Sequence, residues 1–599
     1  MEEAIAAVTG GLMSVREAAR KHGVARTTLQ RKLSRTPGAL PSAEAHAAAA
    51  GDEVGGAGVK VVVVKSEVGH SPPASDSGNS PSDVDSAPTT SLRRKRPAAA
   101  MDSPASKGPR RAINCKIRML CASAGSALDE LSNEMILEGK CIYKLGLGQS
   151  PFPIPQCIVD ELRANAHQRD YLPVAGLPAL REDIAAWGSK RLHIDYSKDD
   201  VLVGPGTKEL LFVLQTVYYG DLLLPNPSCT SYAPQANIAG RSMIAGSWTL
   251  NMIWLPTFAE DHWVLRPEVL EELCEKDPDA PRILILNSPS NPTGCAYHDD
   301  ELEAVAEVAR KYRVLVISDE IYSELHHTGE HLSISKYYPE GTIVSGGLSK
   351  WCGAGGWRMG FWLFPPSMQW LRKSMLVMAS ETYTSVASPI QYAARRAFVP
   401  EYVGVFRCCL DRFPVTDDLL YQLHRDLVVP GEVPTDPQAH RAVLQKMDVE
   451  VQLPEGGFYI FPSFARHRKA LSDRGLTTDA LLCSRLLQDT GVAILPGSCF
   501  GRRPDELFVR LAFVDFKGEI ALYLVESMVC LDDVVGRHQH CSRANSVSEQ
   551  QDDLELDAIE GFIKSVCPNL DIAMRKLAAW ISCGAVRPSA AVALGGAPS

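Results

Sequence analysis

The sequence predicts an α/β fold built around a mostly parallel sheet. One strand is predicted by a short apolar run with β-branched residues, RILIL (282–286), and a helix by apolar residues at helical spacing in DDELEAVAEVARKYR (299–313). A second apolar run, VLVIS (314–318), follows this helix directly. Two continuously apolar strands joined by an amphipathic helix indicate a βαβ unit, in which helices cover both faces of a parallel sheet.

Length and composition indicate a globular protein with more than one domain. The chain has 599 residues, with 45% hydrophobic and 22% charged residues and a formal net charge of -10. Because this charge disfavours polyanion binding by the whole chain, a nucleic-acid function would be local. No apolar stretch has the length of a membrane span or a signal peptide, so we expect neither secretion nor a membrane partner. The 16 cysteines show no CxxC spacing, so we expect no metal site, no disulfide framework and a reducing intracellular compartment.

Residues 10–38 predict two short helices joined by a tight turn. Ser14 and Glu17 have the spacing of a capping box, and Gly23 would end the first helix. Seven cations lie between residues 14 and 35, which suits contacts with DNA phosphates. The segment resembles the pipsqueak-type helix-turn-helix modules, and this resemblance implies binding of duplex DNA. A solvated basic hairpin is the alternative interpretation.

Residues 39–111 predict a disordered linker, because Ala, Gly, Ser, Pro and Asp dominate and aromatic residues are almost absent. Two basic clusters in it, RRKRP (93–97) and KGPRR (107–111), resemble a bipartite nuclear localisation signal, although charge runs in linkers often only solvate the chain. The expected location is therefore cytoplasmic or nuclear. The α/β domain is expected over residues 112–583, and a disordered tail over residues 584–599.

Two features are predicted near the end of the α/β domain. The polar stretch at 536–553 is expected to be a loop. After it, LDIAMRKLAAWIS (570–582) has the apolar spacing of a final amphipathic helix.

Polar residues follow both predicted strands, at the sheet edge where parallel sheets bind ligands. The first strand leads into NSPSNPTG (287–294) and the second into DEIY (319–322). An aspartate at the mouth of a buried strand needs a cationic partner, and a protonated heterocyclic nitrogen would suit Asp319. The adjacent His326 and His327 predict a solvated loop rather than a set of ligands.

A glycine-rich stretch further along, SGGLSKWCGAGGWRMGF (345–361), isolates Lys350 and places Arg358 eight residues later. Glycines let the backbone approach a ligand, so this stretch favours a bound anion beside a reactive amine. The order NPTG, DEIY, SK and a later arginine resembles the fold-type I aminotransferases, which use pyridoxal 5'-phosphate (PLP). Six more segments match this family in order: LGLGQSPFPIP (145–155), YLPVAGLPALR (171–181), GPGTKELL (204–211), PEGGFYIFPSF (454–464), AILPGSCFG (493–501) and FVRLAF (508–513).

The resemblance covers about residues 115–583 and implies a large domain with a mostly parallel sheet and a smaller α+β domain. It implies that Lys350 forms the aldimine with the cofactor and is the general base for proton transfer. Asp319 would keep the pyridine nitrogen protonated. Tyr322 and Asn291 would hydrogen-bond the ring oxygen.

The same resemblance assigns the groups that bind the phosphate and the substrate. The phosphate would be held by Arg358, Thr207 and Ser349 with the backbone amides near Gly206 and Lys208. Gly148, Asn291 and Arg510 would bind the substrate, with Arg510 taking its α-carboxylate through two hydrogen bonds. Tyr171 would reach the cofactor phosphate of a neighbouring subunit, which implies a homodimer.

Two positions depart from the family pattern. Cys229 stands where many relatives have an aromatic residue that stacks on the pyridine ring, and Tyr232 follows three residues later. Gly347 stands where a phosphate-binding serine is common, so Ser349 is expected to take more of that role. Neither change removes an essential chemical group, so we expect activity, and the sequence leaves open whether Cys229 weakens retention of the cofactor.

The resulting hypothesis is a PLP-dependent transaminase that moves an amino group between an amino acid and a 2-oxo acid. One alternative is a nuclear DNA-binding regulator whose PLP domain senses amino acids or amines. Another is a PLP-dependent lyase or an aminocyclopropane-carboxylate synthase, which shares the same cofactor residues.

Overall fold

The computed structural model of the chain describes residues 114–118, 120, 122–241, 251–327, 331–399, 449–523 and 566–582. The expected helix-turn-helix (10–38), linker (39–111), polar loop (536–553) and tail (584–599) lie outside these residues. None of the helices within the described ranges is long and apolar enough to cross a membrane.

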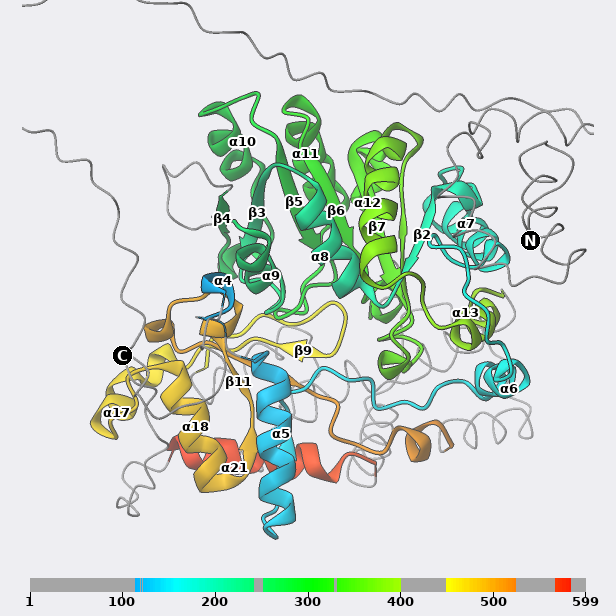
Figure 1. Cartoon of the computed structure of the whole chain (residues 1–599). Helices are drawn as coiled ribbons and strands as arrows, with labels where there is room; N and C mark the ends of the chain where they lie inside the picture. Colours follow the sequence, from blue (N-terminus) through cyan, green and yellow to red (C-terminus); the bar gives the residue numbers. More distant parts are fainter. Residues whose placement is uncertain are drawn as a thin grey trace, which may run out of the picture. The chain divides into compact units, whose positions relative to one another are not determined.

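A seven-stranded sheet forms the centre of the larger domain (Figure 1). Its strands are, in spatial order, β2 (Val201–Gly204), β8 (Gly360–Leu363), β7 (Thr342–Gly347), β6 (Leu315–Asp319), β5 (Arg282–Asn287), β3 (Asp221–Asn226) and β4 (Met252–Pro256). Strand β8 runs antiparallel to both of its neighbours, and every other pair is parallel. The prediction of a mostly parallel sheet is therefore confirmed.

The predicted βαβ unit is present as β5, α11 (Asp299–Lys311) and β6. Successive side chains of a strand point to opposite faces, and both faces here are apolar. Ile283 and Ile285 belong to the core on one face, whereas Leu284 and Leu286 belong to the core on the other. The first face is covered by α8 (Thr207–Val217), α9 (Tyr232–Ala239) and α12 (Gln369–Thr382), and the second by α10 (Pro267–Glu275) and α11.

A third core lies at the β2 end of the sheet, where Val201 and Val203 pack against a separate group of helices. These helices are α6 (Gln156–Asn165), α7 (Pro178–Leu192) and α13 (Ser388–Ala394). A short helix, α4 (Cys115–Arg118), contacts α9 on the other side of the domain.

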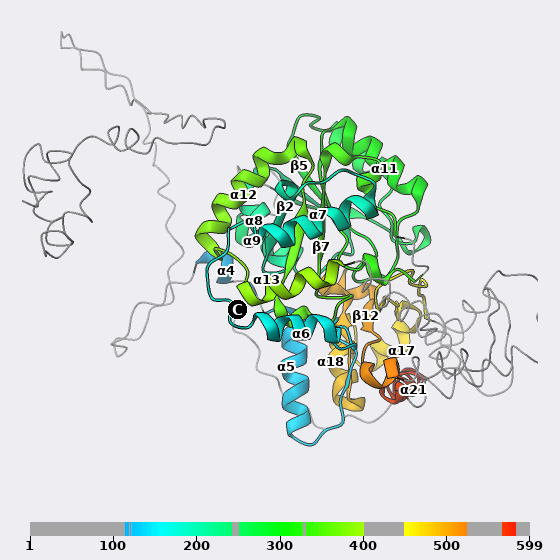
Figure 2. The ribbon, with the colours of Figure 1, turned by 90° about the vertical axis from the view of Figure 1, so that its right-hand side faces the viewer.

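The smaller domain combines short strands with helices, as expected for an α+β unit. An antiparallel set has the order β11 (Leu495–Pro496), β12 (Val509–Ala512) and β9 (Tyr459–Ile460), and β1 (Tyr143–Lys144) pairs in parallel with β10 (Val492–Ala493). Its helices are α5 (Ala124–Leu137), α17 (Arg468–Asp473), α18 (Asp479–Thr490) and α21 (Pro568–Ser582). Figure 2 shows α5, α18 and α21 together below the large sheet. Helix α21 confirms the amphipathic helix predicted at 570–582.

Candidate active site

A cavity of about 480 Å³ opens where the carboxyl ends of the parallel strands meet the smaller domain. Most of the predicted site residues line it: Gly148, Thr207, Lys208, Asn291, Asp319, Tyr322, Ser349, Lys350, Arg358 and Arg510. Gly206 immediately precedes Thr207 at the start of α8. Tyr171 lies elsewhere, with 91% of its side chain exposed.

Lys350 follows β7 and projects its amine into this cavity. Its Nζ donates a hydrogen bond to the carbonyl oxygen of Gly148 at 2.6 Å. The same atom lies 5.5 Å from the centre of the Tyr322 ring and 5.6 Å from that of Phe458. No carboxylate of the described residues forms an ion pair with this amine, so its neighbours leave it available for covalent chemistry.

Gly148 requires the absence of a side chain. A Cβ built on it would lie 1.8 Å from the phenolic oxygen and 2.6 Å from Cζ of Tyr459, so the buried Tyr459 ring would have to shift. The glycine therefore lets the chain pass close to Tyr459 while its carbonyl oxygen accepts from Lys350.

Asp319 is the last residue of β6 and its side chain is buried. Tyr232 donates its phenolic proton to Oδ2 at 2.5 Å, and the Ser345 hydroxyl donates to Oδ1 at 3.4 Å. Burial raises the pKa of Asp319 from its ordinary value of 3.8 to about 6, and the hydrogen bond from Tyr232 partly opposes this effect. A buried carboxylate without a cationic partner fits the role of holding a proton on a heterocyclic nitrogen.

Tyr232 is a site residue that sequence reasoning did not assign. It is the first residue of α9 and is buried against Asp319, so burial and the nearby carboxylate together raise its pKa well above the ordinary value. Cys229, three residues earlier, lines the cavity with a half-buried thiol. A thiol therefore occupies the expected stacking position, while Tyr232, which also lines the cavity, donates a hydrogen bond to Asp319.

The start of α8 forms a cradle for an anion. Gly206 caps the helix with a positive φ of 85°, and a Cβ on it would lie 2.3 Å from Nη2 of Arg358. Arg358 adopts the left-handed conformation, with φ of 55°, and donates to the carbonyl oxygens of Gly355 at 2.8 Å and Pro205 at 3.4 Å. These partners are neutral. A guanidinium folded over the amide groups of a helix N-terminus fits a phosphate group.

Arg510 projects from β12 of the smaller domain and is 5% exposed. Its Nη1 donates to Oδ1 of Asn291 at 2.8 Å, and its Nη2 donates to the carbonyl oxygen of Gly146 at 2.5 Å. Its Nε is buried without a hydrogen-bond partner among the described residues. A buried cation with an unused donor and only neutral partners fits a substrate carboxylate.

Two buried phenols complete the wall between Asp319 and Arg510. The phenolic oxygens of Tyr322 and Tyr459 lie 2.9 Å apart, and the Arg510 guanidinium stacks 4.3 Å from the centre of the Tyr459 ring. Burial, together with the neighbouring Tyr459, raises the pKa of Tyr322 well above its ordinary value. Tyr459 lies within the matched PEGGFYIFPSF segment, but its spacing gave no sign of this contact.

The prediction of a solvated loop at His326 and His327 is wrong. Both ring nitrogens of His327 lie 3.2 Å from backbone carbonyl oxygens, those of Pro454 and Gly457. His326 pairs with the backbone of Gly456, and burial lowers its pKa to about 4. The two residues tie the segment after Tyr322 to the segment before Tyr459. Among the described residues, no group of His, Cys, Asp and Glu side chains has the geometry of a metal site.

Family models match two parts of the chain. The model described as aminotransferase class I and II matches residues 141–401, and the helix-turn-helix Psq domain model matches residues 1–41. The second match confirms the resemblance of the N-terminal segment.

Known proteins similar to this chain include bacterial transaminases. The chain is 32% identical over 410 residues to an aspartate aminotransferase of Geobacillus stearothermophilus, which covers 66% of this chain and 93% of that protein. It is 28% identical to an asparagine–oxo-acid transaminase of Streptococcus mutans over 61% of this chain and 86% of that protein. The solved structure of a Thermotoga maritima aspartate aminotransferase superposes with a TM-score of 0.54 at 26% identity, over 70% of this chain and 100% of that chain.

Proposed function

Because the chain belongs to the class I and II aminotransferase family, we propose that Lys350, Asp319 and Arg510 carry its reaction. The expected cofactor and reaction class are confirmed: the protein is a PLP-dependent aminotransferase, which exchanges amino groups between amino acids and 2-oxo acids. The observation that supports the residue roles is that an amine, a buried carboxylate and a buried guanidinium face one cavity.

Each of these residues has a distinct task in the proposal. When bound, PLP supplies an electron sink for the negative charge that develops at the substrate α-carbon. Lys350 binds the cofactor covalently and later takes the α-proton on its amine. Asp319 holds the proton on the pyridine nitrogen. Arg510 orients the substrate through its α-carboxylate, because a guanidinium matches two carboxylate oxygens at once.

The remaining cavity residues anchor the cofactor. Arg358, Ser349 and Thr207, with the amides of Gly206 and Lys208, bind its phosphate at the start of α8. Tyr322 and Asn291 hold the ring oxygen, and Tyr459 supports Tyr322 through the contact between their hydroxyl groups. The positions of these groups around the cavity support this assignment.

We further propose that the preferred substrates are acidic amino acids and their 2-oxo acids. Several similar proteins are named aspartate aminotransferase. Lys208 lines the cavity, and no carboxylate in the described part of the chain pairs with its ammonium group. Ser123 and Ser126, at the start of α5, line the same cavity and offer hydroxyl donors. A second carboxylate on the substrate could accept hydrogen bonds from the Lys208 ammonium group and from these hydroxyls.

A panel of amino acids with 2-oxoglutarate or oxaloacetate as acceptor tests this proposal. We expect kcat/KM for L-aspartate or L-glutamate to exceed that for L-alanine and L-leucine, and Lys208→Ala to reduce this difference. A preference for aromatic or aliphatic amino acids would contradict the acidic-substrate proposal without affecting the transaminase assignment. A purely eliminating reaction, without 2-oxo acid amination, would support the lyase alternative.

A second proposed function is DNA binding by the N-terminal segment. It is supported by the Psq match and by the seven cations between residues 14 and 35. We also propose a nuclear location, because the basic clusters at 93–97 and 107–111 resemble a nuclear localisation signal. In this view, the aminotransferase domain either acts beside DNA or senses amino acids for a regulator.

Titration of the full chain with labelled duplex DNA at several salt concentrations tests this second function. Each neutralised phosphate should add about 0.9 to the slope of log affinity against log salt. Charge reversal at Arg31 and Lys32 should flatten this slope, whereas the same change at Arg93 and Arg94 serves as a control in the linker. Equal slopes for both variants would exclude phosphate contacts by the helix-turn-helix segment. A change in DNA affinity on adding amino acids, absent in Lys350→Ala, would support the regulator.

We also propose that the aminotransferase domain acts as a homodimer. Dimers are typical of this family, and the exposed Tyr171 has the place in the sequence of the residue that reaches a neighbouring subunit.

A further inference from the structure

The two domains meet along the hairpin that joins β11 to β12 in the smaller domain. This hairpin contains two 3₁₀ turns, η10 (Gly497–Phe500) and η11 (Pro504–Glu506). Asn226, at the end of β3, donates from Nδ2 to the carbonyl oxygen of Gly501 at 2.9 Å. The backbone amide of Ser228 donates to the carbonyl oxygen of Phe500, also at 2.9 Å. The hairpin is thus attached to the end of the large sheet.

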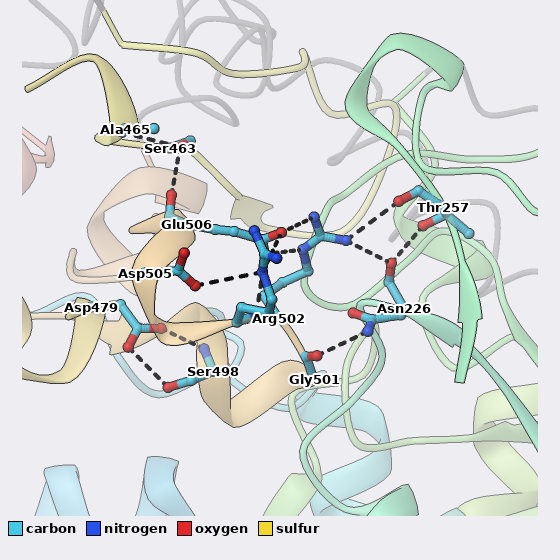
Figure 3. A network of polar contacts seen from close by, with 11 residues as sticks. Asn226, Thr257, Ser463, Ala465, Asp479, Ser498, Gly501, Arg502, Asp505 and Glu506 are labelled. Atoms are coloured by element: carbon cyan, nitrogen blue, oxygen red, sulfur yellow. Dashed lines mark hydrogen bonds and ion pairs between the residues drawn. The ribbon is translucent and has the colours of Figure 1, made fainter. Parts of the chain in front are cut away.

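Arg502 lies at the centre of this attachment and uses three nitrogens of its guanidinium (Figure 3). Nε and Nη2 donate to the two carboxylate oxygens of Glu506, at 2.9 and 3.0 Å. Nη1 points the other way and donates to the carbonyl oxygens of Asn226 at 3.3 Å and Thr257 at 3.4 Å. One side of the guanidinium therefore binds the hairpin, and the other side binds the backbone at the ends of β3 and β4.

The surroundings of Arg502 favour a fixed position. Its side chain is 14% exposed, and its guanidinium lies 5.1 Å from the ring centre of Trp263 and 5.2 Å from that of Phe508. Trp263 belongs to the larger domain and Phe508 to the hairpin. The backbone amide of Arg503 also donates to Glu506, at 3.1 Å, which holds the carboxylate in place. Partly shielded, two-point contacts of this kind are stronger than single surface ion pairs.

The hairpin carries the candidate carboxylate-binding group. Arg510, on β12, lies opposite Leu495 where β12 pairs with β11. The two strands that the hairpin connects therefore meet at Arg510. Its guanidinium stacks 4.9 Å from the ring centre of Phe500, whose carbonyl oxygen accepts from Ser228. Across the domain boundary, Arg510 reaches Asn291. A shift of the hairpin relative to β3 would therefore move Arg510 relative to Asn291.

We propose that Arg502 is a positioning residue that sets the place of Arg510 and thereby the affinity for the substrate α-carboxylate. This inference rests on the proposed role of Arg510. Lysine could not replace Arg502, because an ammonium group cannot donate to both oxygens of Glu506 and to two carbonyl oxygens on the opposite side. Arg503 provides a matched control: it is the next residue, carries the same charge, has 74% of its side chain exposed and contacts Glu506 through its guanidinium only at 3.6 Å, without reaching β3 or β4 in the described residues.

The experiment compares L-aspartate with β-alanine, which is the same molecule without its α-carboxylate. Binding and half-reaction kinetics are followed through the visible absorbance of the cofactor-loaded protein. For Arg502→Met we expect the KM for L-aspartate to rise about tenfold, with a smaller change in kcat and little change for β-alanine. Arg502→Lys should show the same defect, and Arg503→Met should behave as the unaltered protein. Glu506→Gln leaves Arg502 unaltered but replaces its two carboxylate acceptors with a single neutral oxygen, so it should shift the KM in the same direction by a smaller factor.

Two outcomes would overturn the inference. Equal losses for L-aspartate and β-alanine would show that Arg502 only supports general packing, and unchanged kinetics in Arg502→Met and Glu506→Gln would show that the hairpin is held without it. Arg510→Ala separates the inference from its premise. If that variant loses no selectivity for the α-carboxylate, the proposed role of Arg510 fails, and the effect of Arg502 would need another cause.

Discussion

The two domains hold their parts of the cavity in different ways. In the larger domain, Asp319 is the last residue of a strand and Lys350 lies just after another strand. Arg358 lies in a loop folded onto a helix N-terminus. In the smaller domain, Arg510 and Tyr459 come from short strands whose position depends on side-chain contacts across the boundary. The difference suggests that cofactor chemistry is fixed within one domain, whereas substrate recognition depends on how the two domains are held together.

The strongest test of the larger domain's part is Lys350→Ala. We expect complete loss of transamination and of the visible absorbance that a covalent bond between PLP and this lysine produces, because no other amine has its position. Lys208→Ala is the matched control: it removes another cavity lysine and should keep the absorbance. Reduction with borohydride followed by peptide mapping checks the assignment, and a pyridoxyl group on any other lysine would contradict it.

The sequence predicted the site residues at strand ends of the larger domain better than the contacts between distant segments. Asp319 was predictable because the apolar pattern of β6 ends where a polar residue begins, and Lys350 because glycines isolate it. The contact between Tyr232 and Asp319 joins residues 87 apart, and that between Tyr322 and Tyr459 joins residues 137 apart. No local period encodes such pairs, since they depend on how distant segments pack.

The histidine error has the same cause. Polar residues just after a strand usually indicate a solvated loop. His327 instead lies between the carbonyl oxygens of Pro454 and Gly457, which arrive from more than a hundred residues later in the chain. The antiparallel direction of β8 likewise could not be predicted from the sequence. Strand direction depends on how the chain connects one strand to the next and not on the composition of the strand.

Asp319→Asn should separate catalysis from stability within the larger domain. Losing the carboxylate should lower kcat about a hundredfold or more, because among the described residues that line the cavity no other carboxylate could keep the pyridine nitrogen protonated. In protein stripped of cofactor, the pKa of Asp319 is about 6 in the fold against 3.8 ordinarily, so the folded state binds the proton more tightly. Ionisation above pH 6 therefore destabilises the fold by about 3 kcal/mol, and this cost vanishes towards pH 4.

Denaturant unfolding of the cofactor-free proteins measures this effect. At pH 7 we expect Asp319→Asn to be more stable than the unaltered chain by up to about 3 kcal/mol, since asparagine still accepts the hydrogen bond from Tyr232 without carrying a charge. Below pH 3.8, where the Asp319 side chain is protonated in both the folded and the unfolded state, the two should approach equal stability. A variant that is less stable at every pH would show that the buried carboxylate stabilises the fold.

Arg510→Ala tests the smaller domain's part and should have a more selective effect. Charge-assisted hydrogen bonds contribute roughly 1.5 to 3 kcal/mol each, so kcat/KM for amino acids should fall at least about tenfold. The visible absorbance of bound cofactor should remain, because the lysine and the phosphate-binding groups that we propose for the cofactor lie in the larger domain. Arg510→Lys should restore little, since an ammonium cannot match both carboxylate oxygens. Loss of cofactor absorbance in Arg510→Ala would contradict the proposal that the larger domain binds the cofactor and the smaller domain binds the substrate carboxylate.

Tyr171 extends the comparison from two domains to two subunits, and its expected effect is the smallest. Its side chain is 91% exposed in the single chain, so a contact with cofactor phosphate would have to come from a neighbouring copy. A phenol donating to a phosphate contributes roughly 1.5 to 3 kcal/mol, so Tyr171→Phe should weaken PLP retention by about tenfold. Tyr219→Phe, which alters another exposed tyrosine, is the control and should retain PLP normally.

Subunit mixing decides whether the Tyr171 contact crosses the interface. If each cavity uses Lys350 from one subunit and Tyr171 from the other, mixing Lys350→Ala subunits with subunits carrying a more disruptive Tyr171→Arg change should restore activity. One cavity of each mixed dimer would then contain both original residues, because the two changes fall together in the other cavity. A side chain that packs on its own subunit would give no such rescue, since every cavity would keep one defect. An active monomer in sedimentation, or mixed subunits no more active than the parents after exchange, would contradict a shared site.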